Sequence, residues 1–360
     1  MHVFPSFGAG GVPIRITAVM NHFGDNCRHT VIALDGNADA AERIEEDIDV
    51  TIFHPEINKK HPLRTIGAIA GHIRNIAPDL LLTYNWGATE WALVNRIMGK
   101  RPHIHFESGF GPEDADRQIR RRVLFRRIAL RRAERIVVPS ENLVSIVRDI
   151  WRLDTRKLQL IPNGVDCDRY GSPPDASAVQ GFDPAGATVV GTLAPLRAEK
   201  NIGCLIEAFA AATDGTNTRL LIAGEGAERA GLEALAATSS AAARIHFAGY
   251  IDRPEKVLGL MDIFAMSSDT EQMPNALLQA MAAGRPVVST DVGDIRPILS
   301  EENRPYVYAV GDINAYAGGL SALIADRDLR DGLGAANLKR VRDVYSMEKM
   351  LSAYEELLLR

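Results

Sequence analysis

Polar side chains with a chemically suggestive spacing lie in residues 267–294, between two short apolar segments. Glu271 stands in the loop after the first segment, and Gln279 follows eight residues later. Between them, Pro274 and Asn275 begin an Ala/Leu-rich helical pattern. The start of a helix presents free N–H groups and the positive end of its dipole, which suits a phosphate group. An ordinary strand–loop–helix connection without a ligand explains the same residues, so both interpretations stay open at this point.

Two cations, Arg197 and Lys200, follow another apolar segment within residues 189–201. Arginine offers a planar fork of donors and lysine a point charge, so together they can stabilise charge that develops on a leaving anion. Two solvated charges are the alternative. Cations near a helix start are slightly unfavourable, however, and their presence at that end favours a functional role.

A glycine-rich loop, residues 6–13, comes directly after the first apolar segment of the chain. Glycines such as Gly10 and Gly11 let the backbone approach a ligand closely. The loop nearly matches the dinucleotide-binding pattern Gly-x-Gly-x-x-Gly, but Pro13 replaces the third glycine. The nearest acidic residue, Asp35, comes a little later than the ~20 positions expected for that pattern. These departures disfavour a nicotinamide-dependent dehydrogenase.

Two further predicted strands end in polar residues. In residues 102–111, His103 and His105 alternate with an apolar residue, so their side chains share one face of a strand. Packed or surface histidines are the alternative interpretation. At the end of the preceding strand, Tyr84 and Asn85 are candidates to line the same side as these histidines.

Short apolar runs alternate with helical-period stretches along almost the whole chain, which predicts βαβ units and parallel sheets covered on both faces. The predicted strands are residues 2–4, 29–34, 50–54, 80–84, 103–106, 135–139 and 158–161, then 188–193, 219–223, 244–247, 263–265, 286–289 and 306–309. The predicted helices lie near residues 13–23, 63–76, 88–99, 117–133, 140–150, 201–212, 225–238, 275–283 and 312–325. The last forty residues read as helix only, ending at 347–359.

Residues 166–187 are rich in Pro, Gly, Asp and Ser and lack apolar periodicity, which predicts an interdomain linker. The expected domains are therefore residues 1–165 and 188–345, followed by a helical segment at 346–360. Ligands of doubly wound sheets bind beyond the carboxyl ends of the strands. A cleft between the two domains is accordingly the expected site.

The composition excludes several classes of protein. The chain has 360 residues, of which 46% are apolar and 24% charged, so it is neither disordered nor a disulfide-stapled miniprotein. A formal net charge of −5 argues against nucleic acid as a partner. Three scattered cysteines without metal-ligand spacing indicate a reducing compartment. No stretch approaches the ~18 apolar residues of a membrane span, and no signal peptide is evident, so we expect a cytoplasmic protein.

The run from Arg117 to Arg135 holds nine arginines and one acidic residue, Glu134, together with apolar residues at helical spacing. A helix of this kind can lie on an anionic lipid surface, which predicts peripheral membrane contact. The alternative is a solvated helix whose arginines cover a core-facing apolar stripe. Nucleic acid is a poorer explanation, because no aromatic platform accompanies the arginines.

The segment 267–294 resembles the donor-binding signature of GT-B glycosyltransferases, most closely the retaining enzymes of family 4. That signature has a Glu in the loop, a Pro at the helix start, a second Glu eight residues after the first, and then Ala-Met-Ala-x-Gly-x-Pro-Val-Val. The matching residues are Glu271, Pro274, Ala280, Met281, Ala282, Gly284, Pro286, Val287 and Val288. Gln279 departs from the signature, because the family has a Glu at that position.

The resemblance implies a GT-B fold, in which two Rossmann-like doubly wound domains face each other across a cleft and a C-terminal helix crosses back to the first domain. It implies a retaining glycosyltransferase (a hexosyltransferase) that moves a sugar from a nucleoside diphosphate donor, such as a UDP- or GDP-sugar, to a hydroxyl. The acceptor would be a glycan or a lipid-linked molecule, in the synthesis of cell-surface polysaccharide or glycolipid. No protein nucleophile is implied, and domain closure would exclude water.

The resemblance also implies a role for each candidate residue. Arg197, Lys200 and the helix start at Pro274 and Asn275 would hold the donor diphosphate, faced by Gly10 and Gly11. Glu271 would hydrogen-bond hydroxyls of the donor sugar and Gln279 would hold the ribose. His105 would act near the transferring sugar, with Tyr84, Asn85 and His103 on the acceptor side.

No cofactor and no essential metal are expected. Asp-x-Asp triplets occur at 47–49, 114–116 and 166–168, but none follows a suitable strand near a donor site. Two alternatives remain. One is a nucleotide-sugar epimerase on the same fold, because fold does not determine function. The other is a weakly catalytic partner subunit, which Gln279 and Ser108 favour because the family has Glu at the first position and sometimes His at the second.

Overall fold

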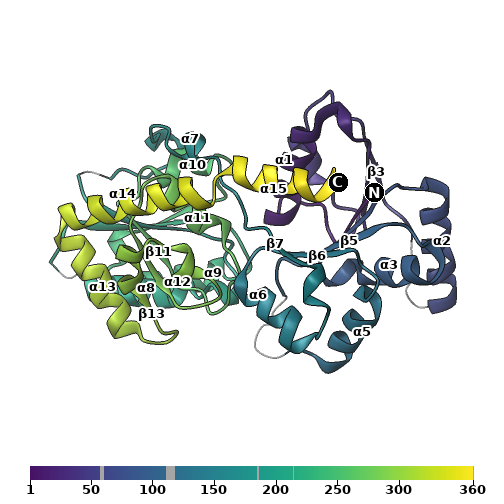
Figure 1. Cartoon of the computed structure of the whole chain (residues 1–360). Coiled ribbons are helices and arrows are strands. Elements are labelled where there is room, and N and C mark those ends of the chain that lie inside the picture. Colours follow the sequence, from purple (N-terminus) through teal and green to yellow (C-terminus); the bar gives the residue numbers. More distant parts are fainter. Residues whose placement is uncertain (57–60, 111–117, 185, 214, 360) are drawn as a thin grey trace. The chain divides into compact units, whose positions relative to one another are not determined.

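The structure, a computed structural model, describes residues 1–56, 61–110, 118–184, 186–213 and 215–359 (Figure 1). The chain divides into two compact units. The first unit comprises residues 1–162 with the C-terminal residues from 351, and the second comprises residues 163–350. Each unit is an α/β domain.

The first unit is built on a seven-stranded parallel sheet with the order β3-β2-β1-β4-β5-β6-β7. Its strands are β1 (His2–Phe4), β2 (His29–Ala33), β3 (Val50–Phe53), β4 (Leu81–Tyr84), β5 (His103–Phe106), β6 (Arg135–Val138) and β7 (Leu158–Leu160). The strand order reverses direction between β1 and β4, as in doubly wound sheets. All seven strands coincide with predicted ones to within one or two residues.

The helices of the first unit are α1 (Gly11–Phe23), α2 (Pro62–Ile76), α3 (Thr89–Val94), α5 (Arg120–Leu130) and α6 (Glu141–Ser145). Two of them continue as π-helical turns, η4 (Asn95–Gly99) after α3 and η5 (Ile146–Ile150) after α6. Short 3-10 turns are η1 (Gly24–Asn26), η2 (Asp39–Arg43), η3 (Trp86–Ala88) and η6 (Thr155–Lys157). The predicted helices at 88–99 and 140–150 are therefore each an α-helix with a widened last turn.

The second unit repeats this plan with a six-stranded parallel sheet of order β10-β9-β8-β11-β12-β13. The strands are β8 (Thr188–Leu193), β9 (Thr218–Ala223), β10 (Ile245–Gly249), β11 (Ile263–Met266), β12 (Val287–Thr290) and β13 (Val307–Tyr308). Here the order reverses between β8 and β11. The two-domain α/β architecture expected from the sequence is thus confirmed.

The longer helices of the second unit are α8 (Ile202–Ala212), α9 (Arg229–Thr238), α11 (Asn275–Ala282), α13 (Ile313–Ala325) and α14 (Arg327–Val344). Single turns not predicted from the sequence are α7 (Cys167–Tyr170), α10 (Pro254–Leu258) and α12 (Ile295–Ile298). The 3-10 turns are η7 (Ala176–Ala178), η8 (Ala198–Lys200), η9 (Ala242–Arg244) and η10 (Glu301–Tyr306). Elements this short carry too little periodicity to be recognised in the sequence.

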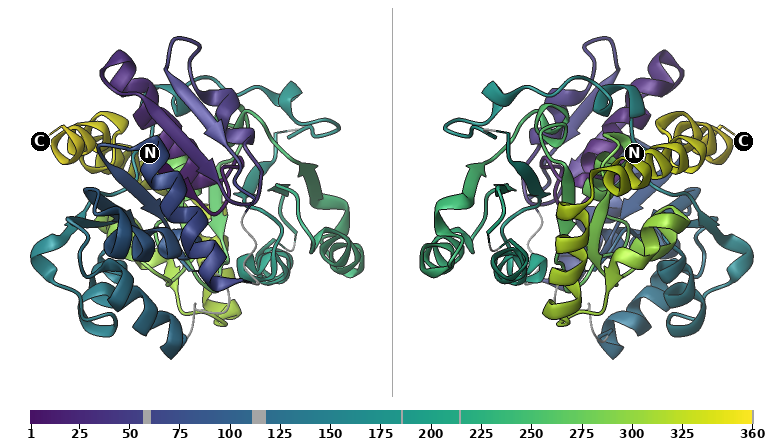
Figure 2. Two further views of the ribbon diagram at one scale, coloured as in Figure 1. Left: turned by 90° about the vertical axis from the view of Figure 1, so that its right-hand side faces the viewer. Right: turned by 90° about the vertical axis from the view of Figure 1, so that its left-hand side faces the viewer.

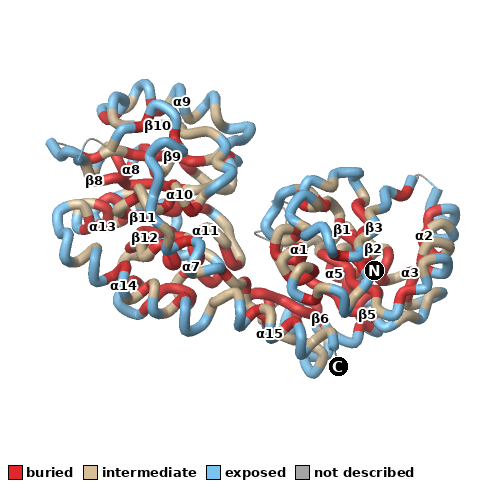
Figure 3. Tube along the Cα trace, turned by 90° about the horizontal axis from the view of Figure 1, so that it is seen from above, coloured by how far each residue is buried: buried red, intermediate tan, exposed pale blue. Residues whose placement is uncertain are grey.

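Alternate residues of the second sheet enter two different apolar layers. Val189 and Phe264 pack into one layer, whereas their neighbours Val190 and Ala265 pack into the other. Successive side chains of a strand point to opposite faces, so both faces of the sheet are buried. Helices cover both faces (Figures 1 and 2), and the buried residues concentrate in the strands, as Figure 3 shows. This explains why the strands read as continuous apolar runs.

Residues 166–187, which the sequence suggested as a linker, lie within the second unit. The side chain of Asp166 caps α7 by accepting from the backbone N–H groups of Asp168 and Arg169. Tyr170 and Phe182 are buried in the core of the second unit. The segment has no helical or strand period because it reaches that core through isolated side chains.

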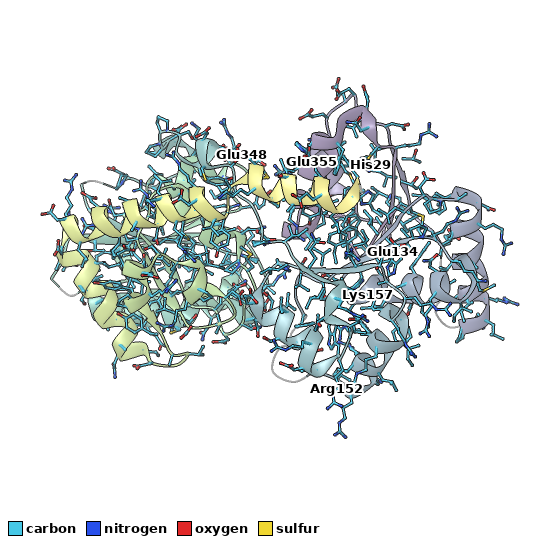
Figure 4. The ribbon with its side chains drawn as sticks, viewed as in Figure 1. His29, Glu134, Arg152, Lys157, Glu348 and Glu355 are labelled. Atoms are coloured by element: carbon cyan, nitrogen blue, oxygen red, sulfur yellow. The ribbon has the colours of Figure 1, made fainter. Side chains whose placement is uncertain are left out.

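The last helix, α15 (Met347–Leu358), begins in the second unit, and its later residues belong to the first. The ring of Tyr354 stacks on that of Phe106, with centroids 5.8 Å apart. Glu355 Oε1 lies 2.7 Å from His22 Nε2 on α1, and Figure 4 labels Glu355. The chain therefore returns to its first unit, as the resemblance implied. No helix within the described ranges combines the length and apolar character of a membrane span.

Candidate active site

The strand-order reversal of the second sheet brings the predicted donor residues together. Residues 194–201 follow β8 and residues 267–274 follow β11, and these strands are parallel neighbours. Their carboxyl ends therefore share one edge, where doubly wound sheets bind ligands. Arg197 and Lys200 lie in the first loop and Glu271 in the second, so side chains about seventy positions apart in sequence meet at one edge.

Lys200 and Glu271 form an ion pair at this edge. Lys200 Nζ lies 2.5 Å from Glu271 Oε1, and the hydroxyl of Ser268 donates to the same oxygen at 2.9 Å. The side chains are only 17% and 11% exposed. Partial burial strengthens their attraction, because the effective dielectric is lower than in water. The sequence placed both residues at the donor site but did not reveal that they contact each other.

Three further hydrogen bonds fix the two loops to each other. Asn201 Nδ2 donates to Asp269 Oδ1 at 2.8 Å, and the backbone N–H of Asp269 donates to Glu199 O at 2.9 Å. The hydroxyl of Ser267 donates to Lys200 O at 3.0 Å. The loops are therefore held in place before any ligand arrives, which reduces the cost of ordering them on binding.

Arg197 is available to an external anion. Its side chain is 66% exposed, and its contact with Glu199 is long, at 3.9 Å. A guanidinium keeps its charge at all physiological pH values. Arg197 can therefore act as an exposed cation beside the more buried Lys200.

Glycines that the sequence analysis did not single out shape this edge. A Cβ at Gly224, after β9, would lie 1.8 Å from Ala194 O, and one at Gly293, after β12, would lie 2.3 Å from Glu271 O. Both glycines have positive φ, +147° and +54°. Only glycine combines these backbone angles with such close approach. Gly224 directly follows the predicted strand 219–223, and Gly293 comes four residues after the predicted strand 286–289, which is the signal that could have identified them.

The start of α11 completes the site in the second unit. Pro274 is the N-cap and is buried, and Asn275 is the first helical residue. Asn163 Nδ2 donates to Asn275 Oδ1 at 2.9 Å and to Met273 O at 3.0 Å, so it holds this helix start in place. Gln279 lies half-buried one turn after Asn275, hence on the same face of the helix.

The reversal point of the first sheet carries a strained residue. Asn85, directly after β4, has φ 54° and ψ −176°, a backbone region that is essentially reserved for glycine. Its N–H donates to Phe106 O at 2.8 Å, and its Oδ1 accepts from Ser108 N–H at 2.9 Å. Gly10 and Gly11, at the start of α1 in the loop after the neighbouring strand β1, are exposed. Strain held at a reversal point indicates a functional site.

The histidines of β5 share one face, as predicted, because the hydroxyl of Thr83 contacts both. Thr83 Oγ1 lies 2.8 Å from His103 Nε2 and 2.8 Å from His105 Nδ1. His105 is completely buried, and its Nε2 lies 3.8 Å from Glu107 Oε2. Burial lowers the pKa of His103 to about 3, with a smaller contribution from His105.

Glu107 was missed by the sequence analysis. It directly follows β5, its side chain is completely buried, and its carboxylate oxygens accept no hydrogen bond from the described residues. Arg126 Nε lies 3.6 Å from Glu107 Oε2. A charged residue at the carboxyl end of a predicted strand was the available signal. Glu107 and His105 together form a buried polar cluster near the end of β5.

Two residues predicted for the acceptor side lie elsewhere. The Tyr84 ring is buried between Phe4 and Phe106, and its hydroxyl bonds His2 Nδ1 at 2.9 Å, so Tyr84 is a core residue whose pKa is raised by burial. His103 begins β5 opposite Leu81, at the amino edge of the sheet. Of Tyr84, Asn85 and His103, Asn85 alone lies at the carboxyl edge of the sheet with its side chain partly exposed.

The arginines of α5 have two different roles. Arg126 is buried against the rings of Trp86, Trp151 and Phe110, at 4.7, 4.8 and 5.3 Å. Arg127 donates to Ile150 O and Trp151 O at 2.7 Å. These arginines hold the helix to the unit. The arginines exposed to solvent are Arg120 and Arg121 within α5, and Arg131, Arg132 and Arg135 after its end.

Two of the earlier predictions fall on residues outside the described ranges. Arg117 and the triplet at 114–116 lie there. In the remaining triplets, Asp49 pairs with Arg28 and Asp166 caps α7. Across the described part of the chain, no group of three His, Cys, Asp or Glu residues is arranged to hold a metal ion.

Comparison with known families gives a match in each half of the chain. Residues 9–169 match the model of Glycosyltransferase Family 4, and residues 187–326 match that of Glycosyl transferases group 1. Among curated relatives, the lipopolysaccharide core biosynthesis glycosyltransferase LpsE of Rhizobium meliloti (strain 1021) is 28% identical over 63% of this chain and 65% of its own length. N-acetyl-alpha-D-glucosaminyl L-malate synthase of Bacillus anthracis is 28% identical over 45% of this chain and 42% of its own length. The chain thus spans less than two thirds of these relatives.

Solved structures share the fold over nearly the whole chain. Anabaena Alr3699/HepE in complex with UDP-glucose has a TM-score of 0.84 at 17% identity, over 99% of this chain and 98% of its own. Sucrose-phosphate synthase from Thermosynechococcus elongatus has a TM-score of 0.83 at 19% identity, over 99% and 97%. At these identities the likeness establishes the architecture of the two units.

Proposed function

Because this chain belongs to the GT-B glycosyltransferases, with family matches in both halves, we propose that it transfers a sugar from a nucleoside diphosphate donor to a hydroxyl of a glycan or lipid-linked acceptor. The observation that carries the proposal is the convergence of Arg197, Lys200 and Glu271 at the strand-order reversal of the second sheet. Two cations and a carboxylate lie at one edge there, which suits a diphosphate and the hydroxyls of a sugar.

The ion pair suggests how the donor is received. A diphosphate that approaches Arg197 and the start of α11 competes with Glu271 for the ammonium of Lys200. When Lys200 turns to the phosphate, the Glu271 carboxylate is released to accept hydrogen bonds from sugar hydroxyls. Both new contacts are charge-assisted, so they replace the lost ion pair by interactions of similar strength. Gln279, on the same helical face as Asn275, would hold the ribose.

We propose a retaining reaction without an essential metal. Arg197, Lys200 and the positive end of α11 would stabilise charge on the departing diphosphate, which is the task that a divalent cation performs in other enzymes. The acceptor hydroxyl would approach the face that the diphosphate leaves. In the first unit, Asn85 and the His105–Glu107 cluster lie at the carboxyl edge and would serve the acceptor and the transferring sugar.

The relatives support a choice of donor and pathway. One is named for lipopolysaccharide core biosynthesis, and one structural neighbour was solved with UDP-glucose. We therefore propose a UDP-sugar as donor and cell-surface polysaccharide or glycolipid as product. An acceptor of this kind is consistent with peripheral contact between α5 and a membrane. The exposed arginines on and after this helix would add a general attraction to anionic lipid, because Arg126 and Arg127 are occupied within the unit.

Binding of nucleotides tests the proposal directly. UDP and GDP are added to the protein and the melting temperature is followed, and a panel of nucleotide sugars is assayed for hydrolysis and transfer. We expect one diphosphate to raise the melting temperature and Lys200→Ala to weaken its binding about tenfold or more, since a charge-assisted contact is lost. Lys339→Ala, which removes an exposed lysine paired with Asp343, is the matched control.

Glu271→Gln separates diphosphate binding from sugar binding. We expect this variant to retain the nucleoside diphosphate and to lose transfer, because its carboxylate is assigned to the sugar. If no nucleoside diphosphate stabilises the wild-type protein, or if both variants transfer sugar at the wild-type rate, the proposed function is wrong.

A further inference from the structure

A hollow in the first unit lies at the edge of the sheet opposite the proposed acceptor site. It has a volume of about 340 Å³ and is lined by the turn that leads into β5, by the end of α3 with η4, and by the end of α5. His103 and Glu134, which contribute to its wall, stand at the amino ends of β5 and β6. Asn85 and Glu107 follow the carboxyl ends of their strands, so this hollow is a separate site.

Four cations line the hollow against one carboxylate. The cations are Arg96, Lys100, Arg101 and Arg132, and the carboxylate is Glu134. None of the four forms an ion pair with any acidic residue in the described ranges. Like charges gathered without counter-ions raise the local concentration of anions. The composition of the wall therefore suits an anionic ligand.

The cations stand on a rigid turn. Asn95 is buried and clamps Arg101 with both ends of its amide, since Oδ1 accepts from Arg101 N–H at 3.0 Å and Nδ2 donates to Arg101 O at 2.9 Å. Lys100 adopts φ 53° in the same turn, after the π-helical turn η4. Because the backbone of this turn is already ordered, little backbone entropy is lost when Lys100 and Arg101 bind a ligand.

The carbonyl end of α5 does not oppose an anion here. Helix C-termini carry partial negative charge, which would repel one. Lys157 Nζ donates to Arg131 O at 3.2 Å and to Ala133 O at 2.9 Å, and Arg96 donates to Ile128 O. These cations neutralise the carbonyl end, and Figure 4 labels Lys157 and Glu134 in the first unit. His103 stays neutral at pH 7, because burial holds its pKa at about 3.

Exposed apolar side chains lie on two elements that line the hollow. Ile97 and Met98 lie between Arg96 and Lys100, and Leu124 and Ile128 lie one turn apart on α5. The Arg96 contact with Ile128 O brings these two elements together. A free phosphate in water gains nothing from apolar neighbours. A lipid headgroup does, because the surrounding acyl chains and interface accept Ile, Leu and Met side chains.

We propose that this hollow binds the phosphate headgroup of an anionic membrane lipid, with the apolar side chains around it inserted into the interface. The site would hold the first unit at a membrane independently of the donor site. It requires no sugar transfer, so it does not rest on the proposed function, and its test uses binding alone.

Vesicle binding by the full chain tests this site. Vesicles of phosphatidylcholine with phosphatidylglycerol are compared with vesicles of phosphatidylcholine alone by flotation. The variant Lys100→Gln/Arg101→Gln/Arg132→Gln is expected to lose roughly a hundredfold in affinity for the anionic vesicles, since each cation at such a surface contributes about a factor of five. The matched variant Arg120→Gln/Arg121→Gln/Arg131→Gln removes three exposed arginines outside the hollow, two in α5 and one directly after it, and should lose only a few-fold in affinity.

Two further variants test the charge of the wall and the exposed apolar side chains separately. Glu134→Gln removes the single carboxylate of the wall and should strengthen binding to anionic vesicles several-fold, and it breaks no ion pair among the described residues. Ile97→Ser/Met98→Ser should weaken vesicle binding. UDP binding should be unchanged in all these variants, which separates this site from the donor site.

Several outcomes overturn the proposal. Equal losses in the two triple variants would mean a diffuse basic face rather than a site. Binding of inorganic phosphate or glycerol 3-phosphate that the hollow variant abolishes, without binding to anionic vesicles, would identify a soluble phosphate as the ligand. Failure of the wild-type protein to float with anionic vesicles would exclude a lipid headgroup.

Discussion

The contact between Lys200 and Glu271 affects how strongly the proposed donor site would bind a diphosphate. A lysine that is already paired does not offer a free charge, so the net gain on binding a diphosphate is smaller than the gross attraction. In exchange, the paired state keeps two partly buried charges compensated when no donor is bound. Arg197 remains exposed and has only a long contact with Glu199, which suits it for the first encounter with an anion.

Gln279 stands where the family signature has a carboxylate, and its replacement by Glu is expected to tighten donor binding. A carboxylate accepts from both ribose hydroxyls, whereas an amide accepts with one atom and donates with the other. We expect Gln279→Glu to lower the Kd for UDP by about tenfold, which corresponds to ~1–2 kcal/mol. Isothermal titration calorimetry measures this.

Gln180→Glu, on the exposed surface of the same unit, is the control for added charge. Equal or weaker binding by Gln279→Glu would show that position 279 does not contact the ribose.

Asn85 stores backbone strain that its side chain helps to hold. Asn85→Ala should destabilise the protein by about 1–3 kcal/mol, because alanine keeps the strained angles and loses the hydrogen bond from Ser108 N–H. Asn85→Gly relieves the strain and should restore most of the free energy of unfolding. Urea unfolding followed by tryptophan fluorescence reports this, since Trp86, Trp91 and Trp151 all lie in the first unit.

Acceptor kinetics separate the structural role of Asn85 from a role in transfer. If Asn85 contacts the acceptor, Asn85→Gly should raise the acceptor KM although it is stable. A glycine variant no more stable than the alanine variant would show that the backbone at position 85 is not strained.

At the level of elements, the proposed donor site depends on how closely the turns after β9 and β12 approach the loops that carry Lys200 and Glu271. Gly293→Ala combines a positive φ with a Cβ 2.3 Å from Glu271 O, so the loop carrying Glu271 must move. We expect a loss of stability above ~2 kcal/mol and at least tenfold weaker UDP binding, measured by calorimetry.

Gly284→Ala is the matched control. Its φ is also positive, at +68°, but nothing lies within 4 Å of the added Cβ. The alanine at positive φ should lower the free energy of unfolding by about 1 kcal/mol, and UDP should bind as it does to the wild-type protein. Similar UDP affinities for the two variants would mean that the contact with Glu271 O does not position the site.

The whole first unit should lose stability in mild acid. Burial lowers the pKa of His2 and His103, and it lowers that of His29 to about 4. The unfolded chain takes up protons at these histidines below about 6.5, whereas the folded chain does not until about 4 or lower. The contribution of these histidines to the free energy of unfolding is therefore fully present above pH 6.5, and it is lost as the pH falls toward 4.

Urea midpoints from tryptophan fluorescence between pH 7.5 and 4.5 measure this dependence. His103→Gln removes one of the three groups and should flatten it, whereas His61→Gln, on the exposed surface, should not. A midpoint that stays level down to pH 4.5, or an unchanged slope in His103→Gln, would contradict the assignment.

The sequence by itself determined the architecture of this protein and predicted which residues would form the proposed donor site. Strands buried on both faces read as continuous apolar runs, and Arg197, Lys200 and Glu271 follow such runs, so their positions at strand ends were predictable from local pattern alone. The short turns α7, α10 and α12 were not, and neither was the packing of 166–187 into the second core, because isolated contacts leave no period.

Only the tertiary structure decided which of these groups meet. Pairing of β8 with β11 joined Lys200 to Glu271, and the pairing of β4 with β5 placed Tyr84 in the core and His103 at the amino edge. The burial of Glu107 and Arg126 likewise depends on contacts between distant segments, as does the gathering around Lys100 of cations that form no ion pair within the described ranges. Hydrophobic periodicity specifies the face that each residue occupies, but strand order specifies its neighbours, and that order arises from long-range packing.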